Sequence, residues 1–321
     1  MSELVKFLFE GLPVRGVLVR LTDAWAEVLR RRQSVGAHAP EVRTLLGEMT
    51  AAAVLMQANI KFNGALILQV FGDGPVKLAV AEVQPDLSLR ATAKVVGAVP
   101  AGAPLQALLN LHGQGRSAIT LDPKDGHPGQ QPYQGVVPLQ GPQHEPLQRV
   151  QQALEHYMLQ SEQLDTRLVL AADDQVAAGL LIQRVPVQGA GNLEGARAPR
   201  NDDDTGGHED FKRIALLAAT LASDELLTLR SEQILHRLFW QESVRVFAPA
   251  TPRFACTCTR ERVRQMLRGL GREESEGLIA ERGEVEVGCE FCGLQYRFDA
   301  VDVGEMFTPE RDQPPGTQAV Q

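Results

Sequence analysis

Residues 64–83, GALILQVFGDGPVKLAVAEV, carry the strongest fold signal in this chain of 321 residues. Two apolar runs flank Phe71-Gly72-Asp73-Gly74-Pro75, where glycine and proline supply the backbone angles that a tight reversal needs. The pattern predicts a β-hairpin.

Strands and helices are predicted on both sides of this hairpin. Thr22 should cap a first helix, Pro40 should open a second over 40–60, and 145–160 should form a third. Together these elements predict an α+β fold, with an N-terminal domain built on a large, mostly antiparallel sheet and packed helices. The further strands are expected at 16–21, 87–96, 117–122, 135–139, 166–172 and 176–184.

The second half of the chain divides into smaller parts. Residues 188–208 are rich in Gly, Pro and charge and predict an exposed loop, followed by unusually apolar helices. Such helices must lie against the first domain or a partner, and ordinary docking is the simplest interpretation. Their main apolar positions are Phe211, Ile214, Leu217, Leu221, Leu238 and Phe239. The expected division is 1–190 as core, 191–250 as loop and helical linker, 251–308 as a C-terminal module and 309–321 as a disordered tail.

The C-terminal module is predicted to be a small α+β unit. A helix should run over 260–270 and end at Gly271, and a hairpin should span 284–298 with CEFCG as its turn. Asp299 can cap a final helical turn. A unit of this size has a modest core and often needs a metal or a disulfide for stability.

All four cysteines fall in this module, at Cys256, Cys258, Cys289 and Cys292. Two chelating pairs are the usual way to supply the four thiolates of a tetrahedral zinc site, with Zn–S distances near ~2.3 Å. The spacing therefore predicts one Zn²⁺ per chain, bound in the reduced state, although separate buried or reactive thiols would be the alternative. The module contains no histidine, so a closed site is expected rather than a catalytic zinc.

The same cysteines suggest a redox switch. Zinc would keep the sulfurs as thiolates, which is the oxidisable form. If Cys256 and Cys258 lie on an extended strand, their Cα atoms are roughly 6.5–7 Å apart, so a disulfide between them would deform the backbone and be easily reduced. From the spacing alone, a switch and a plain structural zinc module remain equally open.

Composition narrows the class of protein. The net charge of −8 disfavours a nucleic-acid partner, which needs concentrated positive potential. The first residues lack the basic and apolar regions of a signal peptide, and apolar runs long enough for a membrane span are absent, so a cytoplasmic protein without a membrane partner is expected. In that compartment clustered cysteines favour metal binding or redox chemistry. The scattered histidines indicate no conventional active site, and we expect no enzyme.

Over nearly its whole length the chain resembles the redox-regulated holdase chaperones of the 33-kilodalton heat-shock protein family. The two cysteine pairs together are its most specific feature. Thr259, where the family often has Ser, and the long Gly/Asp-rich stretch near 200–208 depart from the pattern without touching a presumed ligand. The segments that carry the resemblance are GEMTAAAVLM (47–56), the 64–83 hairpin, YMLQSEQLDT (157–166), AAGLLIQRVP (177–186), HRLFWQE (236–242), FACTCTRERV (254–263) and EVGCEFCGLQYRFD (286–299).

The resemblance implies a chaperone that is inactive when reduced and zinc-bound. Oxidation by peroxide or hypochlorous acid, usually with heat, would form Cys256–Cys258 and Cys289–Cys292 disulfides and release zinc. The module and the helical linker would then unfold and expose a surface for unfolding client proteins without an ATP cycle, and the protein would dimerise. The six apolar helix positions would be the cover of that surface.

Two other classes of function fit the sequence less well. A zinc ribbon that binds RNA or a protein partner is disfavoured by the charge of residues 251–321, which hold nine Arg, no Lys and thirteen Asp or Glu, a net of 9 − 13 = −4. A thiol oxidoreductase would place Cys289-x-x-Cys292 at a helix N-terminus within a βαβ unit, whereas strand-like runs flank it here.

Overall fold

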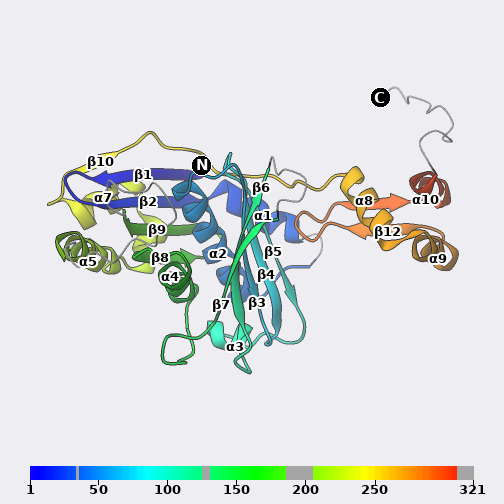
Figure 1. The fold of residues 1–321 in the computed structure, drawn as a ribbon, viewed down its shortest axis with the longest axis horizontal. Helices are drawn as coiled ribbons and strands as arrows, with labels where there is room; N and C mark the ends of the chain where they lie inside the picture. The colour runs from blue at the N-terminus through cyan, green and yellow to red at the C-terminus, as the bar shows by residue number, and fades with distance from the viewer. Residues whose placement is uncertain (34–35, 125–130, 186–204, 309–321) are drawn as a thin grey trace, which may run out of the picture. The chain divides into compact units, whose positions relative to one another are not determined.

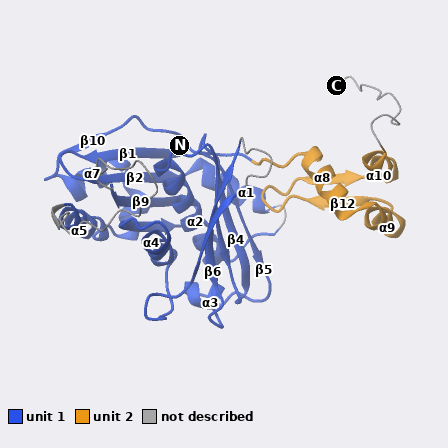
Figure 2. Ribbon diagram, in the orientation of Figure 1, with its two compact units in different colours: residues 1–255 blue, residues 256–321 orange. Residues whose placement is uncertain are grey.

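The structure is a computed structural model that describes residues 1–33, 36–124, 131–185 and 205–308. The chain divides into two compact units, residues 1–255 and 256–321 (Figure 2). Most of the loop predicted at 188–208 lies outside the described residues, but its last four residues begin a helix rather than a loop. The tail predicted at 309–321 also lies outside them, and the four-part division remains a prediction.

The hairpin predicted at 64–83 forms the centre of a six-stranded sheet with the order β11-β5-β4-β3-β6-β7. Leu66 pairs with Val83 and Phe71 with Leu78, and the Gly72 N–H donates to the Lys77 carbonyl at 3.0 Å to close the turn. Among the described strand pairs, only β11 and β5 run parallel. The strands are β3 (Gly64–Phe71), β4 (Val76–Val83), β5 (Ser88–Val95), β6 (Arg116–Pro123), β7 (Tyr133–Pro138) and β11 (Arg253–Phe254).

A second, five-stranded antiparallel sheet has the order β10-β1-β2-β9-β8. The α+β class is confirmed, but the expected single large sheet is two sheets. The strands of this second sheet are β1 (Glu3–Phe9), β2 (Val14–Leu21), β8 (Thr166–Ala172), β9 (Ala177–Arg184) and β10 (Val244–Val246).

Helix α2 (Pro40–Asn59) lies between the two sheets and packs on strands of both (Figure 1). Every residue of this helix from Ala51 to Ala58 is buried. A helix between two sheets must be apolar on all sides, which the run Ala51-Ala52-Ala53-Val54-Leu55-Met56 achieves. Within the described residues, no helix combines the length and apolar character needed to cross a membrane.

Three further helices complete the core of unit 1. Helix α4 begins at Val150 rather than at Glu145 as predicted, because Pro146 disfavours a helical conformation of the residue before it. The Gln152 side chain accepts the N–H groups of Gln148 and Arg149, each at 3.0 Å, and so caps the true start. The helices are α1 (Asp23–Gln33), α3 (Leu105–Leu109) and α4 (Val150–Ser161).

Helices α5 (Thr205–Ala219), α6 (Ser223–Thr228) and α7 (Ser231–Phe239) share an apolar cluster with the five-stranded sheet. The sheet contributes side chains from β1, β2, β8 and β9, and Phe239 meets Phe9 edge to face with ring centroids 4.9 Å apart. Of the six predicted cover residues, Leu217 is partly buried and the others are buried: Phe211, Ile214, Leu221, Leu238 and Phe239. Their role in client binding remains a prediction.

Unit 2 contains α8 (Arg260–Leu270), α9 (Arg272–Arg282), β12 (Val285–Gly288), β13 (Gln295–Phe298) and α10 (Ala300–Phe307). The predicted helix, its end at Gly271 and the hairpin are confirmed. Asp299 caps α10 by accepting the N–H groups of Val301 and Asp302, at 2.9 and 2.8 Å. The fully apolar core is small: Leu267, Val285, Phe298, Val303 and Met306.

Candidate metal centre

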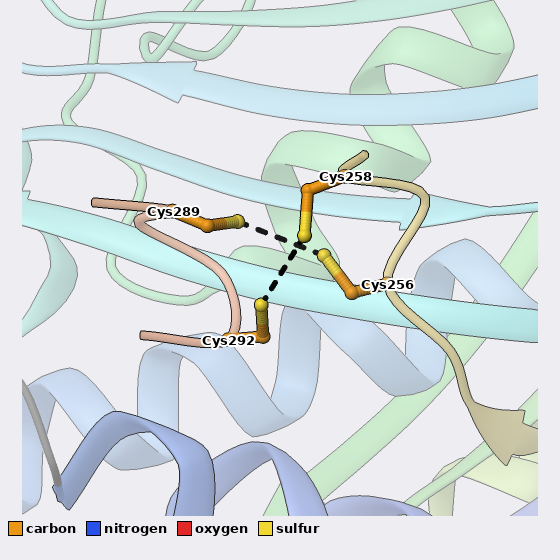
Figure 3. A group of neighbouring side chains, drawn as sticks. All are labelled: Cys256, Cys258, Cys289 and Cys292. Atoms are coloured by element: carbon orange, nitrogen blue, oxygen red, sulfur yellow. Dashed lines mark hydrogen bonds between the residues drawn. The ribbon is translucent and has the colours of Figure 1, made fainter. Parts of the chain in front are cut away.

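The structure brings all four cysteines together, and their sulfurs face one another (Figure 3). The four Sγ atoms lie within 4.8 Å of one another, with 3.7 Å between Cys256 and Cys289 and 3.4 Å between Cys258 and Cys292. In a tetrahedral site with Zn–S bonds near 2.3 Å, the sulfurs are about 3.8 Å apart. The four side chains therefore fit a zinc ion without large movement.

The Cys289–Cys292 pair lies in the tight turn between β12 and β13. The Cys289 N–H donates to the Leu294 carbonyl at 2.9 Å, and the Gly293 N–H donates to the Cys289 carbonyl at 2.8 Å. Gly293 has φ of +71°, the left-handed conformation expected of the glycine after C-x-x-C. The turn thus presents both sulfurs on one side.

The thiols in this turn are poor acids before metal binds. Burial raises the pKa of the Cys289 thiol, against the opposing effect of hydrogen bonds from the backbone N–H groups of Cys292 and Phe291. Burial also raises the pKa of Cys292 well above its usual range. A bound cation would oppose both effects, because it stabilises the thiolate directly.

The Cys256–Cys258 pair lies in neither a helix nor a strand. The extended strand assumed for it is therefore wrong, and the strain argued for a Cys256–Cys258 disulfide loses its premise. Contacts from the first turn of α8 hold the segment between Cys256 and Cys258. The Arg262 Nη1 donates to the Thr257 carbonyl at 3.0 Å and to Thr257 Oγ1 at 2.7 Å. Thr259 Oγ1 accepts the Arg262 N–H at 3.2 Å and caps the same helix.

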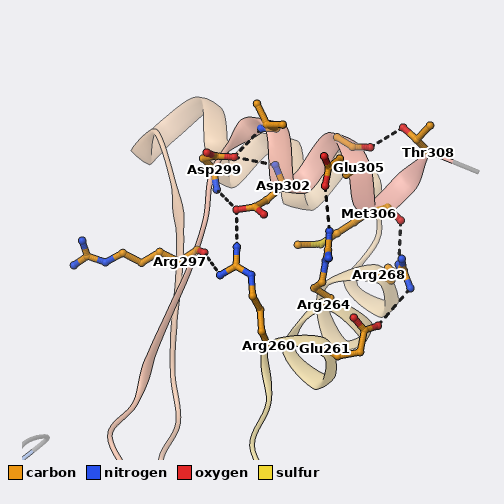
Figure 4. A network of polar contacts seen from close by, with 12 residues as sticks. Arg260, Glu261, Arg264, Arg268, Arg297, Asp299, Asp302, Glu305, Met306 and Thr308 are labelled. Carbon is orange, nitrogen blue, oxygen red and sulfur yellow. Dashed lines mark hydrogen bonds and ion pairs between the residues drawn. The ribbon is translucent and has the colours of Figure 1, made fainter. Parts of the chain in front are cut away.

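Polar contacts hold the two cysteine-bearing segments of unit 2 in place (Figure 4). Arg260 donates to the Arg297 carbonyl and to Asp302, each at 2.7 Å, and its guanidinium lies 4.2 Å from the centroid of the Phe298 ring. These contacts connect α8 to β13 and α10. Because the Arg260–Asp302 ion pair is partly exposed to solvent, it contributes little to stability, so a metal ion would be the strongest link between the two segments.

Tyr296 adds a hydrogen bond that the sequence did not predict. Its hydroxyl donates to Cys258 Sγ at 3.2 Å, and this bond raises the pKa of Tyr296 because ionisation removes the proton that the tyrosine donates. A donor to a sulfur also lowers the nucleophilicity of that sulfur. The signal available in the sequence was only an aromatic residue four positions after Cys292, which is ordinary for a hairpin core.

Replacement of Tyr296 by phenylalanine should therefore make Cys258 more reactive. The loss of one hydrogen bond of about 0.5–1 kcal/mol predicts a two- to fivefold faster alkylation of Cys258 by iodoacetamide. Mass spectrometry with isotope-coded reagent measures the rate at each cysteine of the zinc-loaded protein. Tyr133→Phe, in unit 1, is the control, and an unchanged Cys258 rate in Tyr296→Phe would contradict the assignment.

An α+β unit followed by a small module with four clustered cysteines defines the class: two-part proteins with a C-terminal four-cysteine cluster that could hold a metal ion. The family model described as "Hsp33 protein" matches residues 2–299. The chain therefore belongs to the Hsp33 family, and a chaperone function follows from that membership.

Individual relatives agree with this assignment. The chain is 47% identical over 306 residues to a 33 kDa chaperonin of Chromobacterium violaceum, covering 95% of this chain and 94% of the relative. It is 40% identical over 313 residues to a 33 kDa chaperonin of Nitrosococcus oceani, covering 98% and 96%. Its fold is similar to the crystal structure of a 33 kDa chaperonin from Thermotoga maritima, with a TM-score of 0.72, 21% identity and coverage of 95% and 97%.

Proposed function

We propose that this chaperone is a redox-regulated, ATP-independent holdase that is inactive when reduced and zinc-bound. The observation that carries the proposal is the cluster of four cysteines within 4.8 Å, in a unit whose apolar core is small. A bound zinc ion would keep the sulfurs as thiolates and connect the segments around residues 256–258 and 289–292. Folding of unit 2 and the redox state of its cysteines would then be coupled.

A peroxide can convert each cysteine pair to a disulfide in two steps. One cysteine thiolate attacks a peroxide oxygen, the O–O bond breaks, and a sulfenic acid and hydroxide result. The second thiolate of the pair attacks that sulfur, the S–S bond forms, and a second hydroxide leaves. Two electrons pass from the sulfurs to one peroxide, and solvent protons convert the hydroxides to water. We infer the pairs Cys256–Cys258 and Cys289–Cys292, which leave no thiolate to bind zinc.

Loss of the metal centre would unfold unit 2 and then destabilise helices α5–α7. Helices α6 and α7 span six and nine residues, so they depend on packing against the sheet for their stability. Two hydrogen bonds of 2.6 Å also join these helices to the sheet. Arg20 of β2 donates to the Leu227 carbonyl of α6, and the Ser231 hydroxyl of α7 donates to the Glu3 carboxylate of β1. Release of the helices would expose the apolar side chains of β1, β2, β8 and β9 to client proteins.

The clients would be unfolded or oxidatively damaged proteins, held without catalysis and without nucleic acid or membrane, in the cytoplasm under oxidative and heat stress. We expect a homodimer after oxidation, because an exposed apolar face of this kind also favours self-association. The oxidoreductase alternative loses support because Cys289 and Cys292 lie in a hairpin turn and not at a helix N-terminus.

The test follows zinc, thiols and activity in the same sample during peroxide treatment at elevated temperature. A chromogenic chelator should report release of about one zinc per chain as four thiols disappear. Light scattering of a denatured client should show suppressed aggregation only after both changes. Peptide mapping should find the two proposed disulfides, and reductant should reverse the activity. Chaperone gain without zinc release would contradict the mechanism.

A further inference from the structure

Strand β11 occupies the edge of the six-stranded sheet beside β5. Arg253 lies opposite Ser88, and Phe254 lies opposite Leu89, in parallel register. The Arg253 N–H donates to the Leu87 carbonyl at 3.2 Å, and the Ala255 N–H donates to the Leu89 carbonyl at 3.0 Å. A parallel strand of two residues is a weak edge partner, so it can be exchanged for another strand.

The β5 edge also offers side-chain contacts to its partner strand. Asp86 forms an ion pair with Arg253 at 2.5 Å, and both side chains are more than half exposed. Phe254 packs against the main core of unit 1, with the Arg31 guanidinium 5.8 Å from its ring centroid. Backbone acceptors, an acidic group and a partly buried aromatic position are the components of a strand-addition site, in which the backbone gives affinity and the side chains give preference.

The site extends beyond the part that β11 fills. Strand β5 continues to Val95, whereas β11 pairs with only its first two residues. A cavity of about 440 Å³ is lined by Trp25 and Leu29 of α1, by Arg43 of α2, and by Ala91 and Thr92 of β5. Ala91 is two residues past the last position that β11 covers. A longer extended segment therefore has a hollow to enter along the same edge.

The position of β11 in the chain connects this edge to the redox centre. Ala255, the last residue of β11 with a hydrogen bond to β5, directly precedes Cys256. The Cys256 sulfur lies 3.7 Å from that of Cys289, and a Cys256–Cys258 disulfide would replace that contact. The rearrangement would start at the residue after the last hydrogen bond of β11.

We propose that the β5 edge, from Leu87 to Thr92, is a strand-binding site that β11 fills in the reduced protein and an extended client segment fills after oxidation. This inference rests on the proposed function. The preferred client segment has a basic residue followed by an aromatic one. Asp86 would pair with the basic side chain, and the aromatic side chain would take the place that Phe254 occupies in the reduced protein. Binding at this edge would give a client directional backbone hydrogen bonds, in addition to the apolar contacts that the surface under α5–α7 provides.

A labelled peptide with the sequence of residues 249–255, PATPRFA, is the probe. It should bind the oxidised full-length protein and compete with a denatured client, and it should bind the reduced, zinc-loaded protein at least tenfold more weakly. N-methylation of the Arg and Ala amides removes the two donors to β5 and should weaken binding by about tenfold or more. N-methylation of the Phe amide is the matched control, since alternation turns that N–H away from β5, and it should have a much smaller effect.

The possible results separate this inference from the proposed function. If the oxidised protein suppresses aggregation but the three peptides bind alike or not at all, the β5 site is wrong and the holdase function stands. If oxidation gives no suppression, the proposed function fails and the assignment of clients to this edge fails with it. Binding that follows the methylation pattern, together with competition by the client, supports both.

Discussion

Replacement of Cys292 by serine should abolish zinc binding and unfold the described part of unit 2, while unit 1 keeps its two sheets. Cys292 is the buried member of the four cysteines, and a serine hydroxyl is a poor zinc ligand. Structural zinc supplies about 10–16 kcal/mol in small modules. The five-residue apolar core of unit 2 cannot replace a term of that size.

Metal analysis should show zinc falling from about one per chain to near zero. Hydrogen exchange should show loss of protection in α8, α9 and α10, with protection retained in β2, β3 and β9. Met266→Ser, an exposed position on α8, is the control and should keep both zinc and protection. A folded, zinc-loaded Cys292→Ser protein would show that the fourth sulfur is dispensable.

The sequence predicted those elements that have their own apolar repeat or their own turn residues within a short stretch of chain. The hairpin at 64–83, the helix from Pro40 and the strands at 166–172 and 176–184 each have an apolar pattern of their own, and each is confirmed. The number of sheets could not be predicted in this way. Whether strands join one sheet or two depends on what covers their faces, and α2 separates them by being apolar on all sides.

Elements without a local pattern were missed. Strand β11 has two residues and pairs with a strand more than 150 positions earlier in the chain, so its formation depends on tertiary contact alone. Helix α9 is rich in charge and contains Gly277, and Ser275 is the residue it buries, which gives no apolar stripe. For both, packing and not propensity decides the structure.

The candidate metal centre was also predictable only in part from the sequence. Clustering of four cysteines in a short module predicted that their sulfurs would meet, and the structure brings them within 4.8 Å. The sequence could not show that sulfur contacts of 3.7 and 3.4 Å run between the pairs, from Cys256 to Cys289 and from Cys258 to Cys292. Nor could it place the Tyr296 hydroxyl on Cys258, because that contact depends on how the β13 hairpin and the α8 loop meet.

Replacement of Phe239 by alanine should activate the chaperone without oxidant. Phe239 is 2% exposed and packs on Phe7 and Phe9 of β1, so its loss should cost about 3–5 kcal/mol. Much of that cost falls on the docking of α5–α7, since the sheet keeps its other side packed against α2. The reduced, zinc-loaded variant should then suppress aggregation of a denatured client, and hydrogen exchange should show lost protection confined to residues 205–246.

Trp240→Ala is the matched control because the neighbouring side chain is equally aromatic but 67% exposed. Its effect on stability should stay within about 0.5 kcal/mol, and it should remain inactive until oxidised. Leu235→Ala, which truncates a smaller buried side chain of α7, provides a milder variant if Phe239→Ala fails to fold. If either α7 variant loses helix protection, keeps its sheet and still holds no client, the surface beneath α5–α7 is not where clients bind. Activity in both variants with zinc still bound would separate the two events, because the metal centre would then control the chaperone only through the docking of these helices.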